Sequence, residues 1–337
     1  MILLEHTSLK SFNTFGIEAE SRYFTELTHE NDLRELLQSG LLQQQSFFIL
    51  GGGSNVIFSK NYPGIVVKVG LKGIEMVNED TETILLKVAA GENWSNFVDY
   101  CVEKGWGGVE NLTAIPGTVG ASPVQNVGAY GTEAKDVIES VEAYEIVTGF
   151  KHTFTNVECK FDYRNSIFKQ ALKNQFVITS VTFRLQKTPH LQLGYGAVKS
   201  QLDKEGIVSP TLADVSRVIA QLRESKLPDP SKIGSAGSFF KNPVVSIAQY
   251  NTLKAQYPTL VAYPHHEGYK LAAGWLIEQS GWKGKQLGKV GVYPLQALVL
   301  YNLGGCTGAE VLALSKAIQQ SVKEAFDVAL EPEAIFV

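Results

Sequence analysis

The spacing of apolar residues predicts a chain of mixed helices and strands. Apolar residues recur every three or four positions in some stretches, as on one face of a helix, and alternate or run together in others, as in strands. Val215, Ile219 and Leu222 share such a helical face, and Thr211 is the predicted N-cap with Asp214 three residues later. The predicted helices are 31–38, 93–104, 211–226, 270–279 and 307–326, and the predicted strands are 46–50, 56–58, 64–69, 83–89, 140–146, 175–185 and 296–302.

Length and composition indicate a globular protein with more than one domain. The chain has 337 residues, of which 44% are hydrophobic, and this is enough for two or three packed domains. Its formal net charge is -4 and its lysines and arginines are scattered, so we expect no nucleic-acid partner. No run approaches the ~20 apolar residues of a membrane span, and the first residues lack the pattern of a secretion signal. We therefore expect a cytoplasmic protein that enters no membrane.

The cysteines and histidines do not have the spacing of a metal site. Cys101, Cys159 and Cys306 are far apart and form no Cys-x-x-Cys pair, as fits a reducing compartment. His265 and His266 are adjacent, and because neighbours in sequence rarely share one metal, we expect surface roles for them and no metal. The Rossmann and P-loop motifs are also missing, so any nucleotide must be held by other means.

The first glycine-rich motif is Gly51 to Asn55, Gly-Gly-Gly-Ser-Asn, which follows a predicted buried strand. Consecutive glycines after a strand turn several backbone N–H groups to one side, and such a nest can cradle a phosphate or pyrophosphate. A tight hairpin is the other interpretation of the same residues.

The second motif is a long uncharged loop, Thr113 to Gly131, with four glycines, two prolines and the amide pair Gln125 and Asn126. Purely structural loops of this length without charge are unusual. The pattern predicts that backbone passes close to a flat polar ligand and that the amides read its edge.

The third motif, Leu227 to Asn242, follows the predicted helix 211–226, which two prolines end. We expect the small residues 234–238 to form a loop that brings backbone amides and the Ser238 hydroxyl to a ligand. Lys226, Lys241 and Asn242 could hold an anionic substrate beside it. A surface linker is the alternative, but the paired aromatics Phe239 and Phe240 count against it. The segment also lacks the Gly-x-Ser-x-Gly pattern of a serine hydrolase.

Arg164 and Tyr195 are two further candidate site residues. Arg164 stands between aromatics in the stretch 161–168, where it either stacks in a core or faces a carboxylate or phosphate. Tyr195 is flanked by Gly194 and Gly196, as suits a mobile lid.

The motifs Gly51–Asn55, Ile115–Gly131 and Leu227–Asn242 together resemble those of the bacterial UDP-N-acetylenolpyruvoylglucosamine reductases. These FAD-containing, NADPH-dependent oxidoreductases make UDP-N-acetylmuramate for peptidoglycan, and so serve cell-wall biogenesis, cell shape and cell division. The resemblance runs from Ser11-Phe-Asn-Thr-Phe15 to Glu331-Pro-Glu333, almost the whole chain.

This resemblance implies an α+β fold, with a two-part FAD-binding domain of the vanillyl-alcohol-oxidase type and a smaller α+β substrate-binding domain. The implied boundaries are 1–68 and 69–227 for the two FAD-binding subdomains and 228–337 for the substrate-binding domain. Return of the C-terminal strand to the FAD domain is an alternative. We also expect a monomer.

The resemblance assigns the glycine nest to the FAD pyrophosphate and the long loop to the flavin. It implies that the UDP-sugar substrate is held by Tyr195, which in type I members closes over the substrate, and by Lys226, Asn242 and Gln296, with Tyr130 and Arg223 as further contacts. The implied cofactor-binding residues are Gly51, Gly52, Gly53, Ser54, Asn55, Thr113, Ile115, Pro116, Gly117, Thr118, Gly120, Ala121, Gln125, Asn126 and Gly128.

The catalytic residues implied by the resemblance are Ser238, Arg164 and Glu333, with Glu331 as the alternative carboxylate. In this family NADPH passes a hydride to the flavin, the flavin N5 delivers it to C3 of the enolpyruvyl ether, and the serine protonates C2. Negative charge develops at C2 and on the adjoining carboxylate. Arg164 and Glu333 would therefore favour the enolate over the ground state.

The chain departs from the family pattern at one place. Relatives often continue the terminal motif with a valine and a flavin-contacting arginine, where this chain has Ala334 and Ile335. Two other functions compete with the reductase: an FAD-dependent oxidase of alcohols or sugars on the same cofactor fold, and a nucleotide-sugar binding protein without redox activity. A polymer-binding structural protein fits least, because glycine loops of this kind serve small ligands.

Overall fold

The computed structural model describes residues 1–230 and 232–337 and divides the chain into two compact units. Each unit is assembled from three separate segments of the chain. Unit 1 consists of Met1–Thr7, Ser21–Gly52 and Pro63–Ser225, and unit 2 of Ser8–Glu20, Gly53–Tyr62 and Lys226–Val337. Among the described residues, no helix is long and apolar enough to cross a membrane.

Unit 1 contains a four-stranded sheet with the order β1-β2-β5-β3. Its strands β3 and β5 are parallel, and Ile65, Val66 and Val67 of β5 are fully buried. Two helices lie between β2 and β3 in the sequence. The bounds are β1 Leu4–Ser8, β2 Glu20–Leu27, β3 Phe47–Leu50, β5 Tyr62–Val69, α1 Glu30–Gln38 and α2 Leu41–Gln44.

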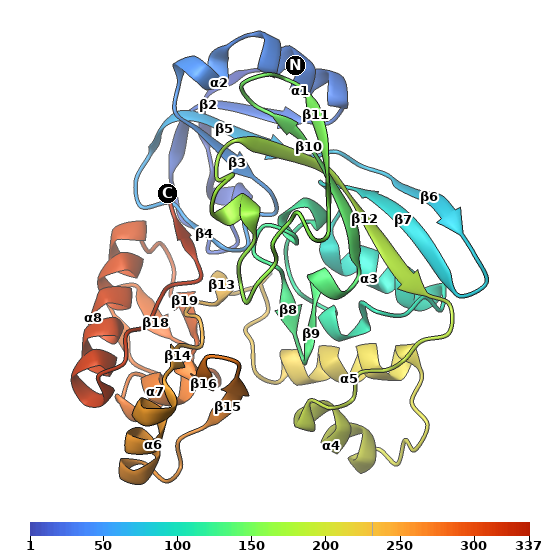
Figure 1. Ribbon diagram of the computed structural model, residues 1–337. Helices are drawn as coiled ribbons and strands as arrows, with labels where there is room; N and C mark the ends of the chain where they lie inside the picture. Colours follow the sequence, from blue (N-terminus) through green and yellow to red (C-terminus); the bar gives the residue numbers. More distant parts are fainter. Residues whose placement is uncertain (231) are drawn as a thin grey trace. The chain divides into compact units, whose positions relative to one another are not determined.

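The second sheet of unit 1 has five strands in the order β11-β10-β12-β7-β6, and each neighbouring pair is antiparallel (Figure 1). The central strand β12 is buried over most of its length. The strands of this sheet are β6 Ile74–Glu79, β7 Thr83–Ala89, β10 Ile138–Glu145, β11 Lys151–Thr155 and β12 Phe176–Gln186.

Unit 1 also contains a short hairpin, three further helices and four 3-10 turns. The hairpin is β8 Gly128–Ala129 and β9 Thr132–Glu133, and the helices are α3 Trp94–Glu103, α4 Gly196–Lys204 and α5 Leu212–Glu224. The 3-10 turns are η2 Glu110–Leu112, η3 Val119–Ala121, η4 Ala134–Asp136 and η5 Ile167–Lys169.

Helix α3 shows how the sequence pattern becomes packing in unit 1. Its N-cap, Asn93, accepts a hydrogen bond from the backbone N–H of Asn96 at 3.0 Å, which pairs one of the donors that a helix start leaves open. The buried rings of Trp94 and Phe97 pack against each other and against Phe183 of β12 at centroid distances of 4.7 to 6.0 Å. The apolar stripe of the helix therefore covers the sheet.

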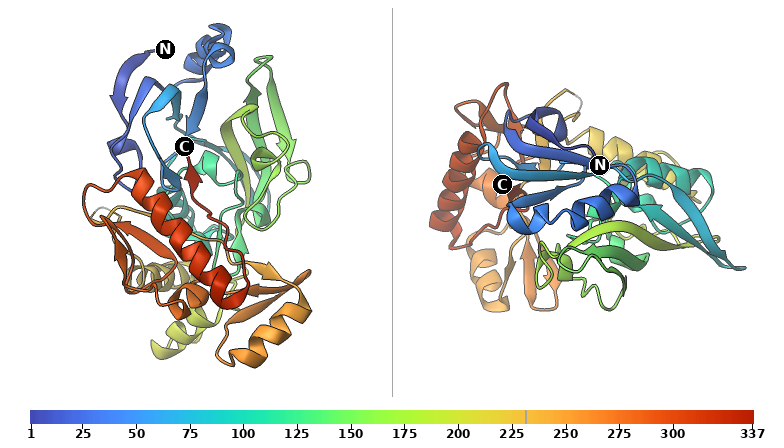
Figure 2. Two further views of the ribbon diagram at one scale, coloured as in Figure 1. Left: turned by 90° about the vertical axis from the view of Figure 1, so that its left-hand side faces the viewer. Right: turned by 90° about the horizontal axis from the view of Figure 1, so that it is seen from above.

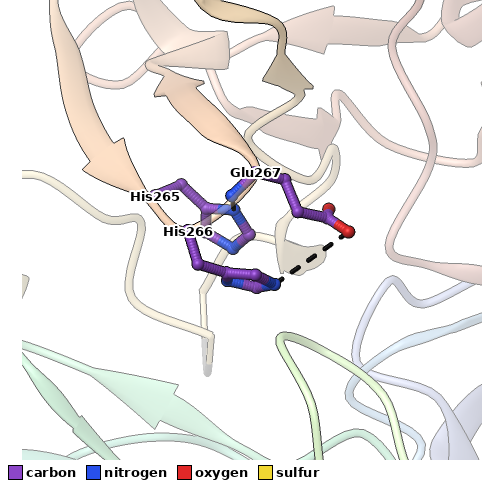
Figure 3. A group of neighbouring side chains, drawn as sticks. All are labelled: His265, His266 and Glu267. Atoms are coloured by element: carbon purple, nitrogen blue, oxygen red, sulfur yellow. Dashed lines mark hydrogen bonds and ion pairs between the residues drawn. The ribbon is translucent and has the colours of Figure 1, made fainter.

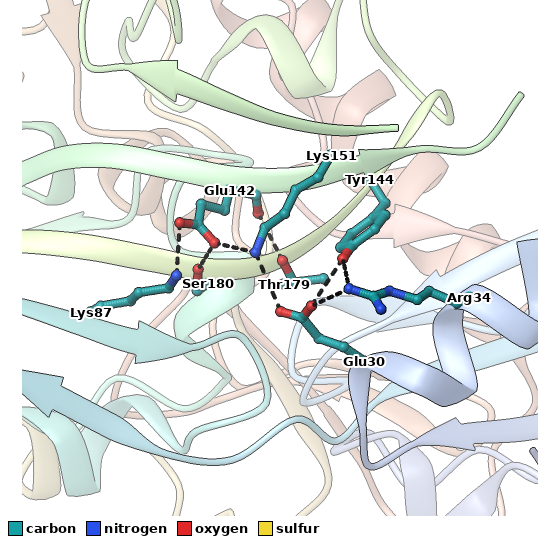
Figure 4. Close-up of polar contacts among 8 residues, drawn as sticks. All are labelled: Glu30, Arg34, Lys87, Glu142, Tyr144, Lys151, Thr179 and Ser180. Carbon is teal, nitrogen blue, oxygen red and sulfur yellow. Dashed lines mark hydrogen bonds and ion pairs between the residues drawn. The ribbon is translucent and has the colours of Figure 1, made fainter. Parts of the chain in front are cut away.

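A cluster of polar side chains joins α1 to the five-stranded sheet (Figure 4). The Glu142 carboxylate accepts from Lys87 and from Lys151, both at 2.7 Å. Tyr144 donates its hydroxyl to Glu30 of α1 at 2.9 Å. Burial raises the pKa of Glu142, but the two lysines outweigh this effect, so its pKa lies below the ordinary value.

Unit 2 contains a four-stranded sheet, β13-β19-β18-β17, and a three-stranded sheet, β14-β16-β15. The long helix α8 packs against β17 and β18 (Figure 2). Its N-cap Thr307 and Glu310 form a capping box. The bounds are η1 Lys10–Phe12, β13 Ser235–Ser238, β14 Val244–Val245, α6 Ile247–Gln256, β15 Ala262–His265, β16 Gly268–Leu271, α7 Ala273–Gln279, β17 Gln286–Leu287, β18 Val290–Val292, β19 Val299–Asn302 and α8 Gly308–Phe326.

The last strand of unit 2, β20 (Ile335–Phe336), pairs in parallel with β4 (Val56–Ile57). The Asn55 side chain supports this pairing by donating to the Glu333 carbonyl oxygen at 3.1 Å, and the Asn55 carbonyl oxygen accepts from the Ile335 N–H at 2.9 Å. Segments far apart in the sequence thus form one layer of the same unit.

Each helix and strand predicted from the sequence overlaps an observed one, and the Thr211 N-cap with Asp214 is confirmed. The predicted loop at 234–238 is wrong. Ser235–Ser238 is strand β13, which pairs with Tyr301 and Val299 of β19. The pairing is irregular between Ser235 and Ser238, where Gly237 has a φ of +65°, so the glycines shape a bulged edge strand.

Candidate functional site

Two glycine-rich motifs meet in unit 1. A Cβ atom at Gly51 would come within 2.7 Å of the Thr118 Oγ1 atom, and one at Gly52 within 2.9 Å of the Gly117 Cα atom. The chain after β3 therefore passes backbone to backbone along the long loop, and the absence of side chains permits the approach. Gly120 shows the same constraint, because its Cβ would lie 2.5 Å from that of Ala90.

The remaining residues of the first motif belong to unit 2. Gly53 has a φ of +65°, and a Cβ there would lie 1.9 Å from the Phe12 carbonyl oxygen. The Asn55 side chain is bound to the Glu333 backbone as described above. These two residues therefore help to shape the turn and its junction with the C-terminal segment.

The long loop is held by buried polar groups. The Thr113 hydroxyl donates to the Glu110 carbonyl oxygen at 2.8 Å and lies 2.9 Å from the Ser216 hydroxyl of α5. Asn126 is fully buried, and its amide binds the Glu133 carboxylate, the Asp162 carbonyl oxygen and the Lys135 N–H. Because these bonds occupy the Asn126 amide, they favour a role in holding the loop over reading a ligand.

The other loop residues of the predicted cofactor set are more open. Ile115, Gly117, Thr118, Gly120, Ala121, Gln125 and Gly128 are half-buried, and Pro116 is exposed. Ser54, in unit 2, is half-buried as well.

Left-handed backbone occurs in two segments of unit 1 that carry predicted site residues. Ala114, Asn126, Tyr130 and Arg164 have φ values of 57°, 47°, 49° and 53°. Residues other than glycine rarely adopt this conformation, and when they do, functional sites are a common place.

Arg164 is brought to the long loop in unit 1. Its terminal Nη2 donates to the Gly128 carbonyl oxygen at 2.7 Å, and its guanidinium carbon lies 5.6 Å from the centre of the Tyr163 ring. The half-buried guanidinium is thus fixed beside the long loop, and both a carbonyl group and an aromatic ring orient it.

Tyr130, Tyr195 and Arg223 form a second group in unit 1. The rings of Tyr130 and Tyr195 meet edge to face at 5.4 Å. Burial raises the pKa of the Tyr130 phenol, and the nearby positive charge of Arg223 offsets only part of this increase. Burial also lowers the pKa of the Arg223 guanidinium. The Arg223 Nε donates to the Ala114 carbonyl oxygen at 3.2 Å, and within the described residues Arg223 has no ion pair. A partly desolvated guanidinium of this kind suits an anion.

Ser238 and Glu333 belong to neighbouring segments of unit 2. The Ser238 side chain is exposed on β13, and no residue that the structure describes forms a hydrogen bond with its hydroxyl. The backbone N–H of Glu333 donates to the carbonyl oxygen of the next residue, Phe239, at 2.7 Å. Glu331, by contrast, is exposed and paired with Lys241 at 2.5 Å. The half-buried Glu333 is therefore the better candidate for a catalytic carboxylate.

Two amide side chains of unit 2 are oriented by backbone donors. The Oδ1 atom of Asn242 accepts from the first N–H of α7, on Ala273, at 2.9 Å. The Oε1 atom of Gln296 accepts from the Leu298 N–H at 3.2 Å. Because each oxygen is engaged, each amide presents its NH₂ group as a donor. Lys226 is exposed and makes no ion pair in the described part of the chain.

His265, His266 and Glu267 gather at the turn between β15 and β16, with their ligand atoms within 4.8 Å of one another (Figure 3). The His265 Nδ1 atom already accepts from the Glu267 N–H at 3.3 Å. His266 and Glu267 extend into solvent. His265 is half-buried and the other two side chains are exposed, so the three residues lie at the surface, as expected for these histidines.

Sequence patterns missed the polar groups that tie these segments together, notably Asn111 and Ser216. Both are buried polar residues. Ser216 carried a weak signal, since it interrupts the apolar face of the predicted helix 211–226. Asn111 carried none.

Comparison with known proteins gives the family. The model of the UDP-N-acetylenolpyruvoylglucosamine reductase C-terminal domain matches residues 229–337, and that of an FAD binding domain matches residues 21–150. The UDP-N-acetylenolpyruvoylglucosamine reductase of Chromobacterium violaceum is 48% identical over 98% of this chain and 97% of its own, and that of Pseudomonas aeruginosa is 46% identical over 98% of each. The crystal structure of the Thermus caldophilus reductase shares the fold, with a TM-score of 0.70 over 99% of both chains at 22% identity. The chain therefore belongs to the UDP-N-acetylenolpyruvoylglucosamine reductase family.

Proposed function

We propose that this chain carries out the reaction of its family with Ser238 as proton donor and Arg164 and Glu333 as its stabilising pair. The reaction is the NADPH-dependent reduction of UDP-N-acetylglucosamine enolpyruvate to UDP-N-acetylmuramate, a step of peptidoglycan synthesis, in an FAD-containing oxidoreductase. The observation that carries the assignment of Ser238 is its exposed hydroxyl, which has no hydrogen-bond partner among residues 1–230 and 232–337 and lies one residue from the backbone bond to Glu333.

The residues of unit 1 fit an FAD pyrophosphate and flavin. Gly51 and Gly52 let the first motif lie directly against Thr118 and Gly117 of the long loop, where any side chain would collide. This close pairing of two glycine-rich segments supports a cradle of backbone N–H groups for a pyrophosphate. The half-buried loop residues and the Arg164 guanidinium beside Gly128 fit a planar polar ring. FAD, when bound, carries the hydride between NADPH and the substrate.

The protein residues supply the proton and the charge stabilisation. Once C3 of the substrate is reduced, negative charge lies at C2 and on the adjoining carboxylate. The Arg164 guanidinium stabilises this charge, and Glu333 acts with it as a hydrogen-bonding carboxyl group. The Ser238 hydroxyl is a weak acid, but the C2 carbanion is more basic still, so the hydroxyl proton passes to C2.

The diphosphate of the substrate is assigned to cationic and amide donors. The NH₂ groups of Asn242 and Gln296 are presented as donors because their oxygens are engaged by backbone N–H groups. The exposed ammonium of Lys226 adds charge. Tyr195, Tyr130 and Arg223 are assigned to further contacts, supported by their grouping in unit 1.

We further propose the functional boundaries 1–68 and 69–227 for FAD binding and 228–337 for substrate binding, a monomeric state, and a location in the cytoplasm. The match of an FAD binding domain to residues 21–150 supports the assignment of the N-terminal part of the chain to FAD binding.

The decisive experiment separates the two half-reactions of the purified flavoprotein. In Ser238→Ala, reduction of the bound FAD by NADPH should proceed at the normal rate. Reoxidation by the enolpyruvyl nucleotide should slow by at least about 10²-fold, the usual contribution of a positioned general acid. Ser200→Ala, which removes an exposed hydroxyl from α4, is the matched control. Normal reoxidation in Ser238→Ala would remove Ser238 from the mechanism.

A further inference from the structure

A buried asparagine outside the predicted site residues joins two segments of unit 1 that carry assigned substrate contacts. Asn111, in η2, is 1% exposed. Its Nδ2 atom donates to the carbonyl oxygens of Tyr130 and Gln192, both at 2.9 Å. Gln192 leads directly into residues 193–196, which we call the Tyr195 loop. One side chain therefore binds the Tyr130 turn to the base of the Tyr195 loop.

The orientation of the Asn111 amide is fixed by these two bonds. A flipped amide would place its oxygen against two carbonyl oxygens, so the NH₂ group must face them. The Oδ1 atom is then buried without a hydrogen-bond partner among the described residues. An unpaired buried acceptor lowers stability, and a native fold that keeps one usually has a use for the geometry it provides.

The Tyr130 turn needs support of this kind. Tyr130 and Gly131, between β8 and β9, have φ values of 49° and 82°. An aromatic residue disfavours this left-handed conformation. The bond from Asn111 anchors the carbonyl group of Tyr130, and the ring of Tyr130 then meets that of Tyr195 edge to face at 5.4 Å.

The same short stretch also binds α5. Thr113 lies 2.9 Å from Ser216, and the Ala114 carbonyl oxygen accepts from Arg223. Residues 111–114 therefore contact the Tyr130 turn, the Tyr195 loop and the helix that carries Arg223, while Asn111 itself is too deeply buried to touch a ligand.

We propose that Asn111 is a positioning residue that fixes the separation of Tyr130 and Tyr195. It thereby sets the contacts that both side chains make with the substrate. The inference rests on the proposed substrate roles of these two tyrosines. Displacing a binding group by a small distance is enough to weaken a contact that depends on alignment.

The first experiment compares Asn111→Asp with a matched control. The aspartate keeps the shape but loses both donors. In Asn156→Asp the same change is made in an asparagine of unit 1 whose Nδ2 also bridges two carbonyl oxygens, those of Lys135 and Ile138, at 2.8 and 2.7 Å. We expect Asn111→Asp to raise KM for the enolpyruvyl nucleotide about tenfold, from the loss of two ordinary hydrogen bonds, with FAD content unchanged. Asn156→Asp should lower Tm and leave KM within twofold.

A double-mutant cycle tests whether Asn111 acts through the Tyr195 loop. In a Tyr195→Ala background, the effect of Asn111→Asp on KM should shrink several-fold, because the group it positions is gone. An equal effect in both backgrounds, or a normal KM in Asn111→Asp alone, would overturn the inference. A normal KM in Tyr195→Ala would instead overturn the substrate role of Tyr195, and the inference with it, whereas the Ser238→Ala half-reaction tests the proposed chemistry independently.

Asn111→Ser serves if the aspartate variant does not accumulate as a folded flavoprotein. Serine is neutral and leaves room for water, but it cannot reach both carbonyl oxygens. The expected rise in KM and its loss in the Tyr195→Ala background are the same, and additive effects again count against the inference.

Discussion

At the residue scale, the amides of Asn242 and Gln296 are divided between structure and ligand. The oxygen of each is bound to a backbone N–H, so only the NH₂ group remains for substrate. The two functions can therefore be separated by changing one atom of the side chain. Gly274, at the second position of α7, adds to this arrangement, because a Cβ there would lie 3.1 Å from the Gln296 Oε1 atom.

Asn242→Asp should weaken substrate binding without loosening α7. The carboxylate still accepts from the Ala273 N–H, but it offers no donor and repels a diphosphate. KM for the enolpyruvyl nucleotide should rise at least about tenfold, the loss of a hydrogen bond to a charged group, while Tm stays within about 2 °C. Asn242→Ala loses both functions and should lower Tm as well. An unchanged KM in Asn242→Asp would contradict the assignment.

Gly52→Ala should lower the FAD content of the purified protein. The added Cβ meets the Gly117 backbone at 2.9 Å, and no flexible side chain can move aside to accommodate it. Gly149→Ala is the control, because Gly149 has a φ of +71° in open space, so the change costs about 1–2 kcal/mol of stability and leaves FAD binding intact. The visible absorbance per mole of protein measures both. Full flavin occupancy in Gly52→Ala would argue against the cradle.

Single residues differed in how far the sequence could predict them. The glycine motifs were recognisable because close backbone approach leaves glycine as the only choice, and the structure shows such approaches at Gly51 and Gly52. The internal use of the Asn126 amide was not predictable, since an asparagine in a loop looks the same whether it faces a ligand or the loop itself. The roles of the individual site residues stay predictions.

At the element scale, the polar cluster around Glu142 joins α1 to the sheet in unit 1. Strands β7, β10, β11 and β12 and helix α1 all contribute to it, so its ionic groups couple four strands to one helix. The Glu142 carboxyl is mostly buried and accepts from two lysines and from Ser180. Hydrogen bonds to a charged group in such a place are worth more than those of an exposed pair.

Stability should depend on Glu142 in a defined pH window. Its folded pKa is lowered, so the carboxylate stabilises the fold above the ordinary value of 4.5 and loses this effect as the pH falls through the folded pKa. Glu142→Gln should therefore lower the free energy of unfolding by roughly 1–3 kcal/mol at pH 7, and the difference from the natural chain should shrink below about pH 4.5. Denaturant unfolding across that range measures it.

The control is Glu139→Gln on the same strand. Glu139 pairs with Arg184 at 3.0 Å, but both side chains are largely exposed, so its loss should cost less than about 1 kcal/mol. Equal effects of the two substitutions would show that burial does not set the strength of the cluster.

Elements with a strong period were predictable and edge elements were not. The apolar face of α5 and the alternation in β7 follow directly from the positions of their side chains. Strand β13 was mistaken for a loop, because Ser-Ala-Gly-Ser has no strand-forming side chains and its extended form comes from pairing with β19. Strand β6 escaped notice because all six residues are exposed on the edge of its sheet.

At the scale of the whole molecule, the family and the α+β fold with an FAD-binding domain, both expected from the three motifs, are confirmed. The three-part division into 1–68, 69–227 and 228–337 remains a prediction about function. The units themselves interleave in the sequence, and unit 2 includes residues 8–20 and 53–62. No local pattern could reveal this, because it depends on pairings between segments hundreds of residues apart.

A fragment of residues 229–337 should not fold by itself. It lacks β4, the partner of β20, and it lacks Phe15 and Phe58, which are almost fully buried. The Asn302 side chain would also lose the Phe15 carbonyl oxygen that it binds at 2.9 Å. Circular dichroism should show no cooperative thermal transition for the fragment, in contrast to the full chain. A sharp transition would mean that these early segments are dispensable.

The pairing of β20 with β4 also has a consequence for synthesis in the cell. Residue 57 leaves the ribosome long before residue 335 has been translated. Strand β4 therefore stays unpaired, and the adjacent Phe58 stays exposed to solvent, until β20 becomes available. Unit 2 therefore closes late in translation. During that interval the nascent chain is the form most exposed to chaperones and proteases, and a premature stop a few codons before β20 would leave the whole unit open.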